Sequence, residues 1–500
     1  MSTERFNLFS MRGKMKILHL NWMAFFITFV VWFNHAPLLQ AMAVSLDMTS
    51  AEIKALLMLN VAMAIPARII VGMLTDRFGP RLMYSGLLLV CSIPCFLFAL
   101  ADTFMQAAIA RFFLGTIGAG FVIGIRVISE WFPARELGAA EGVYGGWGNF
   151  GSAAAAFCLP TLALLFGGSL FGAKDGWRYA IGLTGLLCVA FSFIYYHGVR
   201  NTPKGSTYFR PKSAGALEVT SVGDLWLLIV MKIPLYLALG LLAWRLSEES
   251  VALISESLLV PIYLGLATLY AYDVWHVWKA NRHILTTPVP VLHRYKFKQV
   301  AVLNVLYFAT FGSELAVVSM LPLFFSDTFG LSPVYAGIVA SVYAFMNLMS
   351  RPGGGWISDR FGRKSTLLIL TAGLAAGYAA MAMVDGTWPL WVVVVMAMAC
   401  SFFVQAGEGA VFAVVPLIKR RLTGQIAGMT GAYGNVGAVV YLAVLTAVDY
   451  STFFWVIAAT ALAGFAILLL MEEPNGHIAE VRDDGSVELI SVGRDAPASA

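Results

Sequence analysis

Two arginines stand inside long apolar segments of this 500-residue sequence, at matching places in its two halves. Arg68 lies eight residues before Asp76, and Arg351 lies eight residues before Asp359. At 1.5 Å per helical residue, each arginine would lie about 12 Å along the helix axis from its aspartate. A charge in hydrocarbon costs roughly 2.5 to 3.5 kcal/mol, so such a residue is functional unless it can reach water. Because guanidinium is a charged, planar and forked donor, two opposed arginines suit a small planar oxyanion.

Two glycine-rich stretches, each with one asparagine, are the second chemical signal. They are residues 145–151 (GGWGNFG) and 431–437 (GAYGNVG). Glycine at every third position leaves a stripe without side chains, which lets another helix approach closely and also leaves room for a ligand. Packing alone would explain the glycines, Gly148 and Gly434 among them. The asparagines, Asn149 and Asn435, shift the balance toward binding, because a buried amide needs partners and can donate to an oxyanion.

A repeated loop motif shows that the two halves are duplicates. Residues 72–81 (GMLTDRFGPR) recur as residues 355–364 (GWISDRFGRK), at an offset of 283. Its charged residues are expected to bond to neighbouring helix ends and to act as a latch that holds one side of the molecule closed, without contacting a ligand. These latch residues are Asp76, Arg77, Asp359 and Arg360.

The composition places these residues in a lipid bilayer. Hydrophobic residues make up 59% of the chain and charged residues 12%, against about 25% charged in a soluble protein. The net charge of +5 is spread over short loops, which argues against a nucleic-acid partner. The five cysteines have neither metal-ligand nor disulfide spacing, and no segment carries a catalytic or cofactor fingerprint. We therefore expect no enzyme, no cofactor and no metal site.

Apolar runs of about 20 residues, enough to cross a bilayer, predict fourteen spans. Six lie in residues 17–200, two at about 225–244 and 253–278 within a linker of residues 201–298, and six in residues 299–471. Lys and Arg cluster in alternate loops, which places the N-terminal residues 1–16 and the tail of residues 472–500 in the cytoplasm. The tail is expected to lack a core of its own.

The expected molecule is an all-α polytopic protein of the cell membrane, most simply a monomer. It has two six-helix halves with a binding site between them near the midplane, plus two inserted helices. Among the polar residues of the inserted helices, Lys232 is expected to have a structural role, and no role is assigned to Asp273 or His276.

The motifs resemble those of a known family. The repeated loop motif, together with residues 111–115 (RFFLG), resembles the cytoplasmic loop and fourth-helix motifs of the major facilitator superfamily. The two Gly-Asn stretches and the two arginines resemble the nitrate signature of the nitrate/nitrite porter family. Residues 350–355 (SRPGGG) and 401–409 (SFFVQAGEG) are similar to its nitrate-permease branch in photosynthetic bacteria.

This resemblance implies that nitrate binds between Arg68 and Arg351, inside an aromatic cage to which Tyr307 and Phe311 correspond. Their spacing of four residues puts both rings on one helical face, although ordinary packing or lipid contact would also explain them. The alternative for the arginines is an ion pair with a membrane carboxylate, Glu314 or Glu408.

The resemblance also implies secondary active transport of nitrate, and of nitrite, by alternating access. Moving an anion into a negative cytoplasm costs about 2.3 kcal/mol per 100 mV, so uptake needs proton symport or exchange for an outgoing anion such as nitrite. The sequence leaves both modes open. Glu314 and Glu408 are the proton-coupling candidates, and Glu314 is the one that we expect to couple protons. A permanent ion pair with an arginine is the alternative role for Glu314. A facilitator for another small anion, such as a short carboxylate, and a non-transporting anion sensor are the other interpretations.

Overall fold

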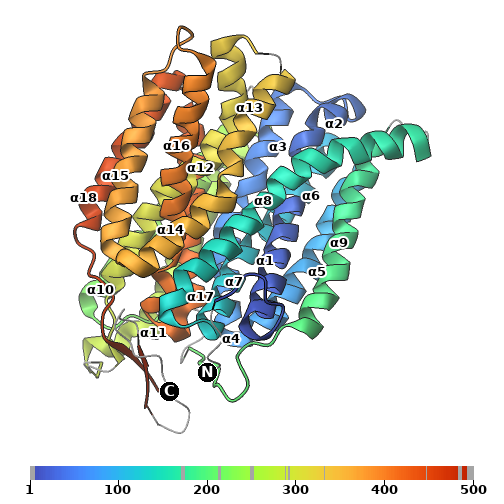
Figure 1. Cartoon of the computed structure of the whole chain (residues 1–500). Helices are drawn as coiled ribbons and strands as arrows, with labels where there is room; N and C mark the ends of the chain where they lie inside the picture. The colour runs from blue at the N-terminus through green and yellow to red at the C-terminus, as the bar shows by residue number, and fades with distance from the viewer. Residues whose placement is uncertain are drawn as a thin grey trace.

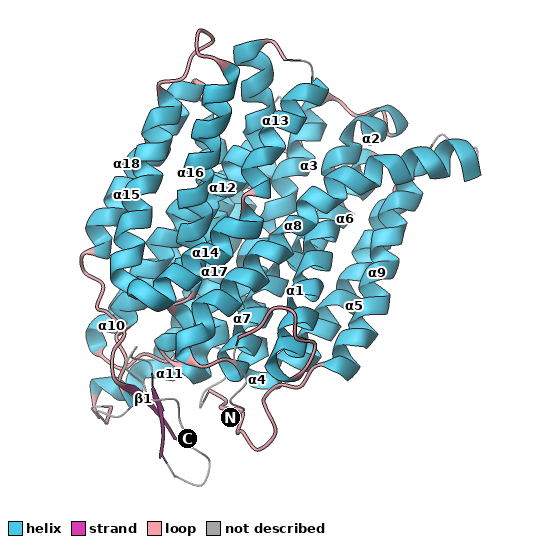
Figure 2. Ribbon diagram, viewed as in Figure 1, coloured by secondary structure: helices cyan, strands magenta, loops and turns pink. Residues whose placement is uncertain are grey.

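The computed structural model is a bundle of long helices that run between two opposite ends of the molecule (Figures 1 and 2). It describes residues 6–170, 175–211, 216–247, 253–287, 289–290, 293–331, 333–445, 447–481 and 487–491. Helix α1 (Gly13–Trp32) begins and helix α18 (Tyr450–Leu468) ends at the same end of the bundle, which we call the terminal face (Figure 1).

The first half lies on the blue-to-green side of Figure 1. After α1 its helices are α2 (Leu39–Ser45), α3 (Ser50–Ala62), α4 (Ala64–Phe78), α5 (Pro80–Ala99), α6 (Phe104–Leu114), α7 (Gly120–Trp131), α8 (Leu137–Leu164) and α9 (Gly176–Gly198). The short turns of this half are η1 (Ala36–Leu38), η2 (Gly115–Ala119), η3 (Ala134–Glu136) and η4 (Leu165–Leu170).

The inserted pair and the second half follow. The inserted helices are α10 (Val222–Ser247) and α11 (Glu256–Asn281), with the turn η5 (Arg282–Leu285) after them. The second half comprises α12 (Phe297–Phe329), α13 (Pro333–Phe345), α14 (Asn347–Phe361), α15 (Arg363–Ala382), α16 (Leu390–Phe412), η7 (Val415–Leu417), η8 (Arg420–Leu422), α17 (Thr423–Leu445) and α18.

The fourteen predicted spans are all present as helical segments. Among the described residues, thirteen segments are long and apolar enough to cross a membrane. The remaining predicted span, from Pro333, consists of α13 and α14, with 13 and 15 residues, each too short to cross alone.

The second span of each half is interrupted at equivalent positions. The break between α3 and α4 is at Met63 and that between α13 and α14 is at Met346, again 283 residues apart. In the first half Pro66 explains the break, because its ring removes a helical N–H and clashes with the carbonyl four residues earlier. Each break precedes the buried arginine by five residues, so both arginines lie in the second turn of the helix that follows.

The repeated loop motif contains a glycine that the turn requires. Gly79 between α4 and α5 has φ +91°, and Gly362 between α14 and α15 has φ +110°. Side chains with a Cβ atom rarely adopt these values, so both halves need glycine to reverse the chain here.

The tail departs from the all-α prediction. Strands β1 (His477–Val481) and β2 (Val487–Ser491) form an antiparallel hairpin beyond α18. Lys419 Nζ donates a hydrogen bond to the carbonyl of Ala479 at 2.7 Å, which ties the hairpin to the turn before α17. Residues 482–486 and 492–500 of the predicted tail lie outside the described residues.

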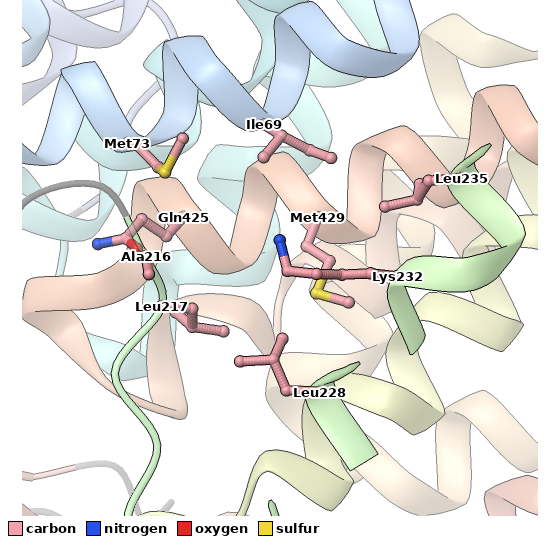
Figure 3. A pocket seen from close by; sticks show the side chains of 9 residues that line it. All are labelled: Ile69, Met73, Ala216, Leu217, Leu228, Lys232, Leu235, Gln425 and Met429. Carbon is pink, nitrogen blue, oxygen red and sulfur yellow. The ribbon is translucent and has the colours of Figure 1, made fainter. Parts of the chain in front are cut away.

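The inserted helix α10 packs at the seam between the two halves. Figure 3 shows a small pocket bounded by α4 of the first half, α17 of the second half and α10. Its lining is mostly apolar and consists of Ile69, Met73, Ala216, Leu217, Leu228, Lys232, Leu235, Gln425 and Met429. The hydroxyl of Tyr433 in α17 also donates to the carbonyl of Met231 at 2.5 Å. The insertion therefore contacts helices of both halves.

The polar residues of the insertion pair with each other. Lys232 Nζ lies 2.7 Å from Asp273 Oδ2, and the Tyr236 hydroxyl donates to the same oxygen at 3.1 Å. The His276 ring packs against Tyr272, with 4.4 Å between ring centroids. The contacts of Lys232 and Tyr236 with Asp273 join α10 to α11 and fit the structural role predicted for Lys232, whereas His276 and Tyr272 both belong to α11.

Replacing Lys232 with Met should destabilise the protein, because it leaves the Asp273 carboxylate unpaired within a membrane helix, at a cost of about 2 to 3 kcal/mol. We expect a melting temperature several degrees lower in detergent micelles. The double variant Lys232→Met/Asp273→Asn should recover most of this loss. A double variant no more stable than Lys232→Met would contradict the ion pair as the link between the two helices.

Candidate functional site

The two predicted arginines meet at the centre of the bundle. Arg68 of α4 and Arg351 of α14 are 0% and 1% exposed. Their guanidinium carbons lie 5.7 and 5.1 Å from the centre of one ring, that of Phe121 in α7. The halves therefore contribute one cation each to a shared aromatic surface.

Arg68 has no carboxylate partner among the described residues. Its Nε donates to the carbonyl of Gly118 at 3.2 Å and its Nη1 donates to the carbonyl of Gly431 at 2.7 Å. Its Nη2 is buried without a hydrogen-bond partner. The guanidinium also lies over the Phe311 ring at 5.0 Å. The site thus holds a positive charge and a free donor, both of which an anion would satisfy.

Arg351 is paired, as the ion-pair alternative proposed. Its Nη1 contacts Glu408 Oε2 of α16, and its Nη2 donates to the Tyr307 hydroxyl at 3.1 Å. Glu314 of α12 is held instead by two amides, those of Asn347 and Gln405. No ion pair joins Glu314 to an arginine among the described contacts, so its predicted alternative role is not the one seen here.

Four rings form an aromatic cage beside the arginines. Tyr307 and Phe311 stack in α12 at 5.1 Å, as their spacing indicated. The ring of Phe412 of α16 is nearly perpendicular to those of Tyr307 and Phe121, with centroids 4.7 and 4.5 Å away. Sequence reasoning missed Phe121 and Phe412, because neither belongs to a repeated motif and only the packing of α7 against α16 brings them together.

The glycine stripes let the arginines lie against bare backbone. A Cβ added at Gly145 would collide with Arg351 Nε, and one at Gly431 would lie 3.1 Å from Arg68 Cδ. Gly434 faces the rings of Tyr307 and Phe311, whereas Gly148 packs against Phe25 of α1. Of the two predicted binding glycines, only Gly434 borders the cage.

The signature asparagines are buried, and none of the described hydrogen bonds joins them to an arginine side chain. Asn435 Nδ2 donates to the carbonyl of Gly431 at 3.4 Å, the same carbonyl that accepts from Arg68. The Oδ1 atoms of Asn149 and Asn435 are buried without hydrogen-bond partners. Such orphaned polar atoms indicate places where a ligand or water completes the hydrogen bonding.

Two aspartates close the terminal face by symmetric contacts that we call the gate. Asp76 of the first half accepts hydrogen bonds from the N–H groups of Gly424 and Gln425, at 2.9 and 2.8 Å, at the start of α17. Asp359 of the second half accepts from Gly138 and Ala139 of α8 at the same two distances. Each carboxylate therefore caps a helix of the opposite half, where the helix dipole favours negative charge.

Other arginines than those predicted complete the gate. Arg77 and Arg360 are exposed and lie over the neighbouring rings of Phe78 and Trp356, so they take no part in these contacts. Arg126 Nε lies 3.4 Å from Asp76 Oδ1 in their place. Arg363 Nη1 lies 2.5 Å from Asp359 Oδ1. These two supporting arginines lie on neighbouring helices, Arg126 on α7 and Arg363 on α15. Arg126 is outside the repeated motif, so the motif could not indicate it.

The linker after α9 braces the first gate contact. The Tyr208 hydroxyl donates to the carbonyl of Thr75 at 2.7 Å, and its ring lies 4.7 Å from the Arg126 guanidinium. Burial raises the pKa of Tyr208, so the phenol stays a neutral donor at physiological pH. The brace therefore does not depend on pH in that range.

A buried cationic site between two repeated halves, closed on one side by symmetric contacts, is the plan of an alternating-access carrier. Residues 22–440 and 303–492 match the model of the Major Facilitator Superfamily, to which the chain belongs.

Its relatives bear on the substrate. The chain is 46% identical over 521 residues to the nitrate/nitrite transporter NrtP of Picosynechococcus sp., covering 96% of this chain and 97% of that protein. It is 29% identical over 439 residues to the high affinity nitrate transporter 2.5 of Arabidopsis thaliana, covering 87% and 74%. The resemblance to the nitrate/nitrite porter family is thereby confirmed.

Among solved structures, the proton:xylose symporter XylE with bound 6-bromo-6-deoxy-D-glucose superposes with a TM-score of 0.59. The match covers 92% of this chain and 96% of that chain at 15% identity. At this identity the likeness shows the fold alone.

Replacing Asp359 with Ala should loosen the gate, because two backbone donors at the start of α8 lose a charged acceptor worth about 1.5 to 3 kcal/mol per bond. A reporter cysteine in place of the buried Ser358, in a Cys158→Ser background, should then react with a water-soluble maleimide at least tenfold faster. Asp385→Ala is the matched control, because it removes an exposed acid that follows the end of α15 distant from the gate. It should leave the labelling rate unchanged. An unaltered labelling rate in Asp359→Ala would contradict the role of this contact.

Proposed function

We propose that this chain carries nitrate, and nitrite, across the membrane by alternating access, with the anion held between Arg68 and Arg351. The observation that carries the proposal is the pair of buried guanidinium groups that both lie near the centre of the Phe121 ring, at 5.7 and 5.1 Å, one of them without a carboxylate partner among the described residues. The names of the relatives, which are nitrate or nitrate/nitrite transporters, supply the substrate.

The chemistry of the site suits a small planar anion. Nitrate presents its oxygens in one plane, as does a guanidinium fork, so the free Nη2 of Arg68 can donate to it without a water between them. The flat faces of Tyr307 and Phe311 can cover that plane and exclude water, which strengthens the charge interaction. A sugar or a bulky organic anion would require the four rings of the cage to separate.

We further propose that the terminal face is the cytoplasmic side of the cell membrane. The loops at this face carry the basic residues of the repeated motif, and the positive-inside rule places such loops in the cytoplasm. The structure then corresponds to a carrier closed toward the cytoplasm. Because one chain supplies every described residue of the site, we propose that the monomer is the working unit.

Proton symport is the coupling mode that the site favours, because Glu408 and the substrate compete for one cation. While Glu408 is ionised it occupies Arg351 Nη1, and a nitrate ion would have to displace it. Protonation of Glu408 removes that competition and offsets the charge that the anion brings. Glu314 lies beside this pair and offers a second place for the proton. Binding of the proton and of the anion would therefore favour each other.

Lysine in place of either arginine should abolish most transport, because the charge remains but the forked donor is lost. We expect labelled nitrate uptake into proteoliposomes to fall at least tenfold in Arg68→Lys and in Arg351→Lys. Arg77→Lys, at the exposed motif arginine, should retain uptake close to that of the unmodified protein. Normal uptake in both Arg68→Lys and Arg351→Lys would contradict the proposed site. Displacement of nitrate by short carboxylates would indicate that the site binds another class of anion.

Glutamine in place of Glu408 should uncouple transport from protons, because a neutral amide mimics the protonated carboxyl. In the unmodified protein an inward proton gradient should raise the initial rate of nitrate uptake. In Glu408→Gln that stimulation should disappear, while exchange of external nitrate for internal nitrite continues. Glu314→Gln, measured beside it, shows whether the second carboxyl shares the proton.

Gradient-driven uptake that survives in Glu408→Gln and in Glu314→Gln would contradict this coupling. Uptake by the unmodified protein that requires internal nitrite and ignores the gradient would establish exchange instead.

A further inference from the structure

Glu141 of α8 is a buried carboxyl that neither the anion site nor the gate contacts use. It is 2% exposed, and neither of its oxygens has a hydrogen-bond partner. Five acidic side chains are buried in the described part of the chain: Asp76, Glu130, Glu141, Glu314 and Glu408. The other four each have a donor or a cation on at least one oxygen. Glu141 is the exception.

Glu141 lies between the gate and the anion site. Gly138, one turn before it, contacts Gly355 of α14 next to the gate aspartate, whereas Gly145, one turn after it, contacts Arg351. The charged groups that face Glu141 are Asp359 and Arg351 of α14 and Arg363 of α15. Both arginines already have carboxylate partners, Asp359 for Arg363 and Glu408 for Arg351.

Several other charged or titratable groups on the helices around α8 are engaged elsewhere. They pair as Lys14 with Glu136, His19 with Trp22, Arg126 with Glu130, Arg178 with Asp102, and His197 with the Phe193 carbonyl. In the part of the chain that the structure describes, no ion pair or hydrogen bond joins the Glu141 carboxyl to a cation in the closed gate.

Because Glu141 is buried without a hydrogen-bond donor, the closed gate favours one protonation state of its carboxyl group. A carboxylate deprived of water and of hydrogen bonds is strongly disfavoured, whereas the protonated carboxyl is neutral. Where α8 separates from α14, water can reach the side chain and the ionised form becomes accessible. A proton on Glu141 thus stabilises the closed gate, and by linkage the closed gate binds that proton more tightly.

The internal repeat shows that the gate contact itself does not require this carboxyl. Gly138 and Gly424 play the same part in the two gate contacts, which pairs Glu141 with Ala427 in the other half. Asp76 caps α17 although that helix has alanine at the equivalent position. A carboxyl present on one side only, and without a partner there, has a role beyond packing.

We propose that Glu141 is a proton-binding site that links pH to the opening of the gate, separate from the carboxylates that compete with substrate. The inference rests on the proposed function only because gate opening is a step of the transport cycle. Lowering the pH closes the gate and raising it opens the gate. Glu141→Gln, which carries the neutral form permanently, holds the gate closed at every pH.

Spin labels at the two exposed motif arginines test this without substrate. In a Cys158→Ser background, Arg77→Cys and Arg360→Cys place one label on each half at the terminal face. Distances between the labels are measured in nanodiscs from about pH 5 to about pH 9 without nitrate. The ratio of long to short distances should rise with pH in the unmodified protein, by no more than about tenfold per pH unit for one proton. In Glu141→Gln it should stay within about twofold of its low-pH value.

Two further variants separate this proposal from the proposed function. Glu141→Asp keeps a carboxyl and should keep the pH response, which distinguishes titration from damage to the fold. Glu408→Gln should also keep the response, even though its proton-driven uptake is lost. A pH response in Glu141→Gln equal to that of the unmodified protein, or no response in the unmodified protein, overturns the role of Glu141 whatever the substrate is.

Discussion

The charge of Arg68, held out of water in the middle of the bundle, is the constraint on which the rest of the structure depends. No described carboxylate neutralises it, so its surroundings stabilise it with two backbone carbonyls and with the faces of aromatic rings. Gly431 serves this purpose twice, since its carbonyl accepts a hydrogen bond and its missing side chain leaves space for the arginine stem. A site arranged in this way is incomplete without an anion.

The same helices carry the central cations and the gate aspartates. Helix α4 holds Arg68 and Asp76, and α14 holds Arg351 and Asp359, and in each helix the aspartate follows the arginine by eight positions. The partner helices α17 and α8 present a gate N–H at their start and a glycine beside an arginine two turns later. A movement that opens the gate must therefore also shift the arginines relative to the cage. In this way the same helices can couple substrate binding to gate opening during alternating access.

The inserted helices add to this plan without interrupting either half. Helix α10 covers the line where α4 meets α17, next to the start of α17 that Asp76 caps (Figure 3). A helix at that seam must move with one half or slide along the other when the gate opens. The pairing of Lys232 with Asp273 holds α10 against α11.

The sequence by itself determined the architecture and the identity of the central residues. Apolar length predicted the spans, because crossing lipid requires about 20 apolar residues, and the repeated motif predicted two halves and paired Arg68 with Arg351. Such features are local or periodic, so they can be recognised along the chain. The spacing of four residues also placed Tyr307 and Phe311 on one helical face, where their rings stack in the structure.

Tertiary structure alone decided which partner each charge received. Glu408 rather than Glu314 pairs with Arg351, Arg126 rather than Arg77 supports Asp76, and Phe121 and Phe412 complete the cage. The solitary position of Glu141 also became visible only in the packed molecule. These contacts join helices that are far apart in the sequence. In a membrane interior the strength of a charge interaction depends on the neighbouring groups that packing brings close. The spacing of residues along the chain does not encode those neighbours.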